Sequence, residues 1–290
     1  REGRGTGRYL VLGSASPDLL RQSSETLAGR ILYLELPPFS VSEADDLDRL
    51  WLRGGFPQSY LARSLPASGR WRRDFIRTYL ERDIPQLGPR IPSETLRRFW
   101  TMLAHHQGGL HNAASLARGL AVDGKTIASY LDLFVDLLLV RRLPPWHRNV
   151  GKRLVRSPRV FVRDTGLLHQ LLGITDRESL LGHPVVGSSW EGFLIENILN
   201  VIDPEVEACF YRTSAGAEID LVLARPGARP IAIEIKRSLA PKVSKGFHIA
   251  CKDIGARQAF VLYPGDERYP LGESVEAIGL PELLQLVAEL

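Results

Sequence analysis

Cysteine is scarce in this sequence of 290 residues, which contains only Cys209 and Cys251. Neither belongs to a Cys-x-x-Cys pair, and no histidine cluster has zinc-binding spacing, so neither a disulfide scaffold nor a structural zinc site is indicated. So low a cysteine content fits a reducing cytoplasm, where we expect the protein to reside. Methionine is scarcer, with Met102 alone, and the sequence begins at Arg1, so we expect a fragment of a longer protein.

Long apolar runs are also lacking. The stretch from 131 to 140 is interrupted by Asp132 and Asp136, and no secretory leader pattern occurs, so we expect no membrane partner. A Gly-x-Ser-x-Gly elbow is absent, and neither cysteine has an evident histidine partner. Nucleophilic hydrolase chemistry therefore has no support in the sequence.

What is present favours a folded chain of more than one domain. Hydrophobic residues make up 44% of the sequence and charged residues 24%, which suits globular domains with real cores. The formal net charge of +4 permits an anionic partner without establishing one. Local patterns must therefore identify the partner.

Residues 211–238 predict a β-hairpin that carries a cluster of charge. In both halves, charged residues alternate with apolar ones, which is the period of half-buried strands. A turn near Gly227 would bring Asp220 opposite Glu234, with Lys236 close by. Hard divalent cations such as Mg²⁺ prefer carboxylate oxygens, and a lysine beside the metal can orient water or neutralise phosphodiester charge. The alternative is an amphipathic hairpin whose charged face meets water.

The order of these residues resembles a known family. Asp220, followed by Glu234-Ile235-Lys236 on the next apolar strand, resembles the acidic-x-lysine signature of the restriction-endonuclease-like, or PD-(D/E)xK, nucleases. The resemblance implies catalytic roles for Asp220, Glu234 and Lys236 and a Mg²⁺ cofactor. It also implies an αβββαβ core, in which residues 187–199 and 243–254 form helices and residues 258–263 form the last strand.

The same resemblance implies further metal ligands. Glu191 lies on the predicted first helix, at the position where that family often contributes another carboxylate. Glu218 stands two residues before Asp220, as a secondary ligand or an outer-sphere acceptor.

Residues 119–126 match the phosphate-loop pattern Gly-x-x-x-x-Gly-Lys-Thr letter for letter. A working phosphate loop follows a buried strand and opens a helix. Here apolar stripes predict one helix over 112–120 and a second one from about 127 onward, joined by a turn. We therefore predict a helix-turn-helix and no phosphate loop.

Short strands predicted at 140–143 and 159–163 flank a basic connection, which resembles a winged helix with a basic wing. The alternatives are a solvated loop or a surface for a neighbouring domain, because Asp132 and Asp136 lie on the second predicted helix. No acidic residue interrupts the basic ones, so we predict a phosphate-binding surface for nucleic acid. Its candidate residues are Arg148, Lys152, Arg153, Arg156 and Arg159.

The first residues predict the tail of an α/β layer, with a strand at 9–16, a helix at 17–27 and a strand at 31–36. They resemble the end of the ATPase module in prokaryotic AAA-type ATPases that carry a C-terminal domain of unknown function. The resemblance implies that Ser14 approaches the γ-phosphate and that Arg30 acts on a neighbouring subunit's nucleotide. ATP binding and a homo-oligomer are thus expected of a full-length parent with its N-terminal ATPase module. Alternatively, Arg30 is a helix-end arginine that interacts with the helix dipole.

The resulting fold class is a multidomain mixture of α/β and α+β. We expect an ATPase remnant at 1–45, a helical lid at 46–100, a winged helix-turn-helix at 101–168 and a restriction-endonuclease-like domain at 169–290. The expected function is the C-terminal part of an AAA-type ATPase with a candidate Mg²⁺-dependent nuclease domain. The alternatives are an inactive nuclease-like module that binds nucleic acid and a protein-interaction adaptor of the ATPase.

Overall fold

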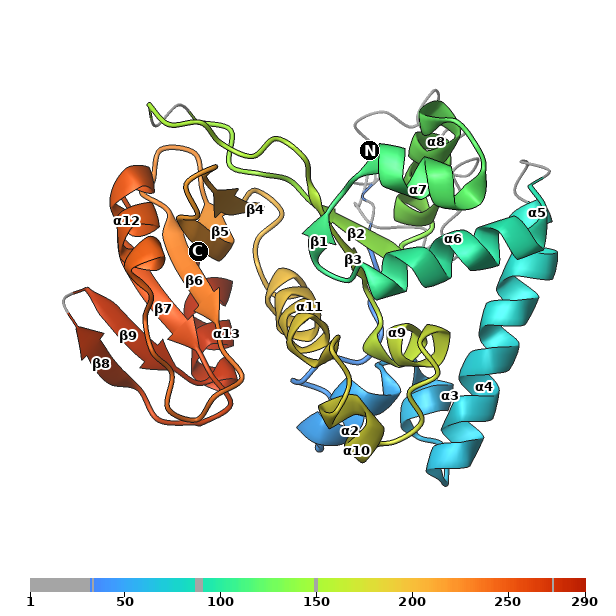
Figure 1. Cartoon of the computed structure of the whole chain (residues 1–290). Coiled ribbons are helices and arrows are strands. Elements are labelled where there is room, and N and C mark those ends of the chain that lie inside the picture. Colours follow the sequence, from blue (N-terminus) through green and yellow to red (C-terminus); the bar gives the residue numbers. More distant parts are fainter. Residues whose placement is uncertain (1–31, 33, 87–90, 149–150, 273) are drawn as a thin grey trace, which may run out of the picture.

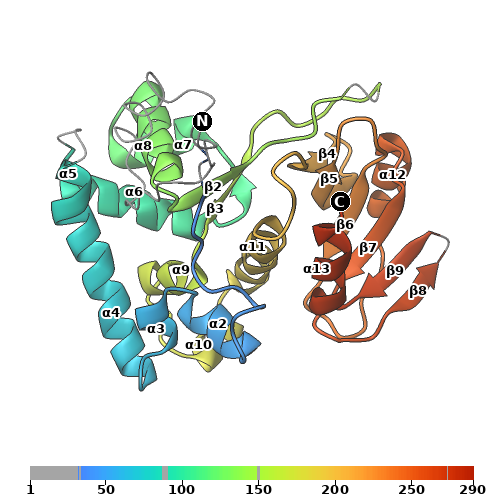
Figure 2. The ribbon, with the colours of Figure 1, turned by 180° about the vertical axis from the view of Figure 1, so that it is seen from behind.

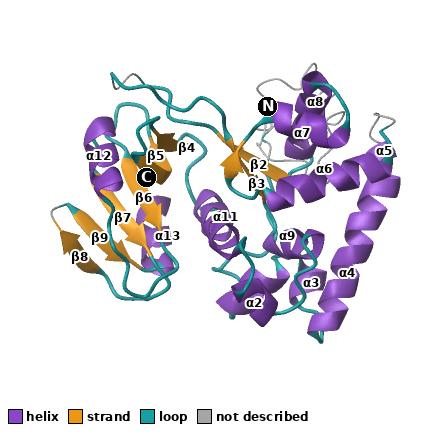
Figure 3. Cartoon of the chain, in the orientation of Figure 1, coloured by secondary structure: helices purple, strands orange, loops and turns teal. Residues whose placement is uncertain are grey.

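The chain is a mixed α/β protein with many helices and two β-sheets, seen in the computed structural model in Figures 1 and 3. The structure describes residues 32, 34–86, 91–148, 151–272 and 274–290. Ser14 and Arg30 lie outside these residues, as do the strand expected at 9–16 and the helix expected at 17–27. The strand expected at 31–36 is wrong for its described residues, 32 and 34–36, which form neither helix nor strand. Within the described residues, no helix is both long and apolar enough to cross a membrane.

The helices predicted between residues 46 and 100 are present. Asp46 and Ser64 begin two of them, because each side chain accepts a hydrogen bond from a backbone N–H in the first turn. Trp71, Phe75 and Tyr79 recur every fourth residue and stack, with ring centroids 5.2 and 5.3 Å apart. The elements are α2 (Leu47–Arg53), α3 (Pro57–Tyr60), α4 (Leu65–Thr78), a π-helical turn η1 (Tyr79–Asp83) and α5 (Ile84–Gln86).

A small antiparallel sheet follows, in the strand order β1-β3-β2, with a pair of helices beside it. We call residues 93–162 the small-sheet region. Asp123 begins the second helix of the pair, because its carboxylate accepts a hydrogen bond of 2.7 Å from the Thr126 N–H. The elements are α6 (Ser93–His105), β1 (Gly109–Leu110), α7 (Ala113–Leu120), α8 (Gly124–Asp136), β2 (Val140–Leu143) and β3 (Arg159–Val162).

The segment 119–126 thus runs from the end of α7 through a short turn into α8. A helix precedes it where a phosphate loop requires a strand. The two helices and the turn that were predicted for these residues are present.

The larger sheet has the strand order β4-β5-β6-β7-β9-β8 and lies between helices on both faces (Figures 1 and 2). We call residues 186–290 the large-sheet region. Strands β6, β7 and β9 are parallel, and the remaining pairs are antiparallel. The elements from here on are α9 (Thr165–Leu171), α10 (Arg177–Leu181), α11 (Val186–Leu199), β4 (Glu207–Arg212), β5 (Glu218–Ala224), β6 (Ile231–Ile235), α12 (Lys245–Ile254), β7 (Gln258–Leu262), β8 (Tyr269–Gly272), β9 (Val275–Ile278) and α13 (Leu280–Ala288).

The predicted order of helix, three strands, helix and strand is therefore present from α11 to β7. Helices α11 and α13 share one apolar cluster with the sheet, which includes Ile195, Ile233 and Leu283. Helix α12 covers the opposite face through Phe247 and Ala250. The additional strands β8 and β9 and helix α13 extend this core.

Helix α11 lies between the large sheet and the helices of the preceding half of the chain (Figure 1). Nearly every residue of this helix from Ser189 to Ile198 is buried. A helix that is covered on all sides must be apolar around its circumference. Its polar residues therefore need partners inside the protein.

His169 is one such internal partner, and it joins α2, α9 and α11. Its Nδ1 lies 3.0 Å from the Leu52 carbonyl oxygen, and its Nε2 lies 2.8 Å from Ser189 Oγ. The Trp51 indole N–H donates to the same hydroxyl at 3.0 Å. Burial disfavours the imidazolium and lowers the pKa of His169 to about 4.

Replacing His169 with Gln should remove a specific part of the pH dependence of stability. The unfolded chain binds the imidazole proton with the ordinary pKa of 6.5, and the folded chain with a pKa of about 4, so stability falls as pH drops below 6.5. Between about pH 7 and pH 5 the loss amounts to about 2 kcal/mol. Urea unfolding of both proteins at the two pH values measures it, and equal losses in both would contradict the assignment.

Candidate functional site

The β5–β6 hairpin brings the predicted catalytic residues together. Leu221 lies opposite Ile233 in the antiparallel register, and one further step along the ladder places Asp220 opposite Glu234. Asp220 Oδ2 accepts a hydrogen bond of 2.9 Å from the Ile235 N–H, which ties the end of β6 to β5. Lys236 Nζ donates to Glu234 Oε1 at 2.5 Å. Two carboxylates and an ammonium therefore meet at one end of these strands.

A further carboxylate reaches this cluster from α11. Glu191 forms a bidentate ion pair with Arg159. Arg159 Nη1 lies 2.6 Å from Glu191 Oε1, and Arg159 Nη2 donates to Glu191 Oε2 at 2.7 Å. The same Nη1 lies 3.6 Å from Asp220 Oδ1. One guanidinium from β3 thus joins a carboxylate on α11 to a carboxylate on β5.

The position of Arg159 differs from the exposed phosphate-binding position that the sequence suggested. Its side chain is only 8% exposed, and its Nε–H donates to the Gly108 carbonyl at 2.7 Å. The guanidinium also lies over the rings of Phe161 and Phe210, at 5.2 and 5.9 Å from their centroids. Strand β3 is buried along its whole length, so its first side chain points into the interior. Arg159 therefore does not belong to the exposed basic surface.

The electrostatics of the cluster reflect crowded negative charge. Burial raises the pKa of Glu191 to about 8, and the charge of Asp220 adds to this effect against the opposing influence of Arg159. Burial likewise raises the pKa of Glu234 to about 7, again with help from Asp220. Burial alone would lower the pKa of Lys236, but the hydrogen bond to Glu234 raises it. These raised pKa values favour the neutral acids, and a cation beside the cluster would favour the charged carboxylates.

Carboxylate oxygens are the ligands that Mg²⁺ prefers, so the chemistry of this donor set fits such an ion. In the described part of the chain, however, no three acidic, histidine or cysteine side chains are arranged as a ready ligand set. Arg159 contacts Glu191 and Asp220, and Lys236 holds Glu234. Glu218, the predicted secondary ligand, instead lies 3.7 Å from the Arg212 guanidinium. Side chains of the protein itself thus offset part of the negative charge.

The described residues of the connection between β2 and β3, 144–148 and 151–158, form a long arm that reaches β4 (Figures 1 and 2). The Trp146 N–H donates to the Phe210 carbonyl at 2.7 Å, and the Val155 N–H donates to the Arg212 carbonyl at 2.9 Å. The Trp146 ring is buried in the apolar cluster of the large sheet that contains Tyr211. We call this segment the basic arm, and it covers the outer edge of β4.

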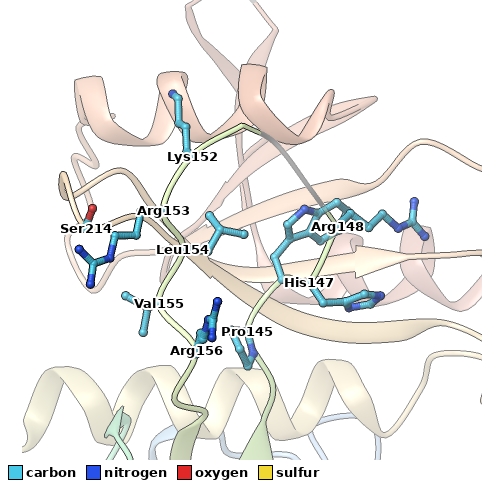
Figure 4. A pocket seen from close by; sticks show the side chains of 10 residues that line it. Pro145, His147, Arg148, Lys152, Arg153, Leu154, Val155, Arg156 and Ser214 are labelled. Atoms are coloured by element: carbon cyan, nitrogen blue, oxygen red, sulfur yellow. The ribbon is translucent and has the colours of Figure 1, made fainter.

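A cavity of about 900 Å³ opens along the basic arm (Figure 4). Arg148, Arg153 and Arg156 line it and are exposed. Arg148 also lies over the Trp146 ring, 5.2 Å from its centroid. Lys152 forms an ion pair within the protein, because its Nζ lies 2.6 and 2.7 Å from the two carboxylate oxygens of Asp253 on α12. The arm therefore presents a concentrated positive surface.

A second ion-pair network joins α11 to the small sheet. Glu196 accepts hydrogen bonds from Arg141 on β2, at 2.8 Å, and from Arg163 just after β3, at 2.9 Å. Burial alone would raise the pKa of Glu196, but the two guanidinium groups lower it. Arg163 also contacts Glu35. This network holds the small-sheet region against α11 and thereby positions Arg159.

Comparison with known proteins divides the chain into two family matches. Residues 44–178 match the family DUF8612, and residues 186–283 match the family DUF4143, both described as domains of unknown function. Arg159 thus belongs to the first domain, whereas Glu191, Asp220, Glu234 and Lys236 belong to the second. The candidate site is built from both.

The chain is similar to longer proteins. The chain is 47% identical over 279 residues to an uncharacterized protein of Mycobacterium tuberculosis and to an uncharacterized protein of Mycobacterium bovis. The alignments cover 96% of this chain and 63% of each relative, so the chain spans less than two thirds of their length. No solved structure matches the chain significantly.

Changing Glu196 to Gln should destabilise the protein strongly. The substitution leaves Arg141 without its carboxylate partner and Arg163 with Glu35 alone, and breaking a buried pair costs about 3–5 kcal/mol in comparable cases. Glu205→Gln is the matched control, because Glu205 forms an exposed pair with Arg225 and should cost about 1 kcal/mol or less. Urea unfolding at neutral pH measures both, and similar losses in the two variants would show that the network contributes little.

Proposed function

We propose that the large-sheet region is a Mg²⁺-dependent nuclease of the restriction-endonuclease-like kind, acting on nucleic acid phosphodiesters. The observation that carries the proposal is the pairing of β5 with β6, which sets Asp220 beside Glu234-Ile235-Lys236. Glu191 approaches the same cluster from the preceding helix. Helix α11 and strands β4, β5 and β6 occur in the order that this fold requires.

In this proposal Asp220, Glu234 and Glu191 hold the metal ion. Bound Mg²⁺ would polarise a phosphoryl oxygen and lower the pKa of a water molecule. The Ile235 N–H fixes the orientation of the Asp220 carboxylate through Oδ2. The Lys236 side chain is 36% exposed, so its ammonium can approach a phosphodiester and neutralise charge that develops during hydrolysis.

The small-sheet region takes the role of a winged helix whose basic arm binds phosphates. Val155 of the arm is hydrogen-bonded to Arg212, and Arg212 pairs with Glu218 at the start of β5. Asp220 lies two residues further along that strand. A phosphate chain that contacts Arg153 and Arg156 would therefore lie near the carboxylate cluster.

The wider assembly follows from the resemblance of the first residues to an ATPase module. We propose that the full-length protein is a cytoplasmic AAA-type ATPase, in which a module outside this sequence binds ATP. Ser14 and Arg30 keep their proposed roles near the γ-phosphate and at a neighbouring subunit's nucleotide. The latter role requires a homo-oligomer.

Two other functions have a specific observation in their favour. Arg159 already contacts both Glu191 and Asp220, which suits a nuclease-like platform that binds nucleic acid without cutting it. The basic arm is docked on β4, which suits an adaptor whose basic surface serves protein contacts. Cleavage and binding experiments separate these alternatives.

Asp220→Ala, Glu234→Ala and Lys236→Ala should each abolish metal-dependent cleavage. Labelled DNA and RNA, single-stranded and duplex, are incubated with Mg²⁺ or Mn²⁺ and the chain, both unaltered and with Arg159→Gln. Loss of several kcal/mol of transition-state stabilisation slows cleavage by at least about 100-fold. Glu205→Gln, a remote exposed carboxylate, should keep full activity. Absence of cleavage on every substrate by both parent chains would favour the inactive platform.

Arg153→Ala combined with Arg156→Ala should weaken nucleic acid binding and its salt dependence. Each lost phosphate contact reduces the slope of log K against log salt by about 0.9 on duplex DNA, so the pair removes about 2. Fluorescence anisotropy between about 50 and 200 mM salt gives this slope. The control pair is Arg77→Ala with Arg82→Ala, on the distant and exposed end of α4 and η1. Unchanged binding in the arm variant would favour the adaptor.

A further inference from the structure

The guanidinium of Arg159 takes the place of a cation between Glu191 and Asp220. It contacts both oxygens of Glu191 and lies 3.6 Å from Asp220 Oδ1. These are two of the carboxylates that would hold Mg²⁺ under the proposed function. A metal ion and this guanidinium therefore compete for the same oxygen atoms.

The competing side chain belongs to the small-sheet region, whereas the carboxylates belong to the large-sheet region. Arg159 pairs with Leu110 in the small sheet and donates to the Gly108 carbonyl at 2.7 Å. Gly108 has a φ of +70°, and a Cβ there would lie 3.0 Å from the Phe161 ring and 3.3 Å from Arg159 Nη2. The backbone approaches the guanidinium closely because this residue is glycine.

Deprotonation cannot release the carboxylates. The guanidinium keeps its charge at every physiological pH, and its fork geometry matches a carboxylate with two parallel contacts. A divalent ion beside it would also meet a like charge in a poorly hydrated setting. The guanidinium must therefore withdraw before the ion binds.

We propose, on the basis of the proposed function, that Arg159 is a gate that closes the metal site by acting as its resident counter-ion. Metal binding and the Arg159 contact exclude each other. Because β3 carries Arg159, whatever shifts β3 relative to α11 changes the affinity for the metal. By thermodynamic linkage the effect is reciprocal, so a bound metal weakens the contact between the two regions.

Isothermal titration calorimetry with Mn²⁺ alone tests the gate without measuring activity. Arg159→Gln should bind Mn²⁺ at least about tenfold more tightly than the unaltered chain, within the usual range of coupling between sites. Arg159→Lys keeps a charge but loses the fork, and should fall between the two. Arg159→Gln combined with Asp220→Asn should lose the gain. Arg142→Gln, which removes an arginine of the same sheet that pairs with Asp132, should change nothing.

The outcomes separate the gate from the proposed function. Equal Mn²⁺ affinity in the unaltered chain and in Arg159→Gln would overturn the gate and leave the metal site standing. No Mn²⁺ binding in any variant would overturn both. A gain that persists after Asp220→Asn would place the ion elsewhere and overturn the gate.

A second measurement uses the unaltered chain and does not depend on the folding of a variant. Under saturating Mn²⁺, amide hydrogen exchange should speed up in β1 and β3, because the Arg159 contact is lost. Exchange in α4, which lies away from the site, is the internal reference. Saturation with Mn²⁺ that leaves exchange in β1 and β3 unchanged would overturn the gate.

Discussion

Buried negative charge on α11 determines how the two sheets are placed. Glu191 and Glu196 lie on a helix that is covered on nearly all sides, and a buried carboxylate without a partner is strongly destabilising. Arg159 forms an ion pair with Glu191, and Arg141 and Arg163 form ion pairs with Glu196. All three arginines come from the small sheet or its immediate end. The small-sheet region must therefore lie where these pairs can form.

This constraint also explains why the candidate site lies at a junction. The β5–β6 hairpin by itself sets Asp220 beside Glu234 and Lys236. Glu191 joins them because α11 packs on the same sheet, and Arg159 joins because it must pair with Glu191. The basic arm then docks on β4 and carries its exposed arginines to the neighbouring edge. Local strand pairing and long-range charge pairing thus act together on one surface.

The sequence predicted what depends on local patterning. Period-two alternation located β5 and β6 and the register of Asp220, and apolar stripes located α7 and α8. The role of Arg159 was not predicted, because its partner lies 32 residues away and the segment that precedes it is rich in basic residues. One signal was available in the sequence: Arg159 is the first residue of a strand whose other residues are all apolar, which indicates a buried arginine with a partner. Strand β8 escaped prediction because Pro270 and Gly272 are typical of turns.

Arg159 stabilises the folded chain, but under the proposed function it opposes metal binding. While it pairs with Glu191, it removes an uncompensated charge from the interior and supports the folded chain. The same contact occupies oxygen atoms that a metal ion would need. Removing the guanidinium would free those oxygens and also leave Glu191 buried without its partner. Such opposition between folding and function is common where like charges gather for chemistry. In this chain the carboxylates lie in the large-sheet region and the guanidinium lies in the small-sheet region. A shift of one region relative to the other can therefore separate them.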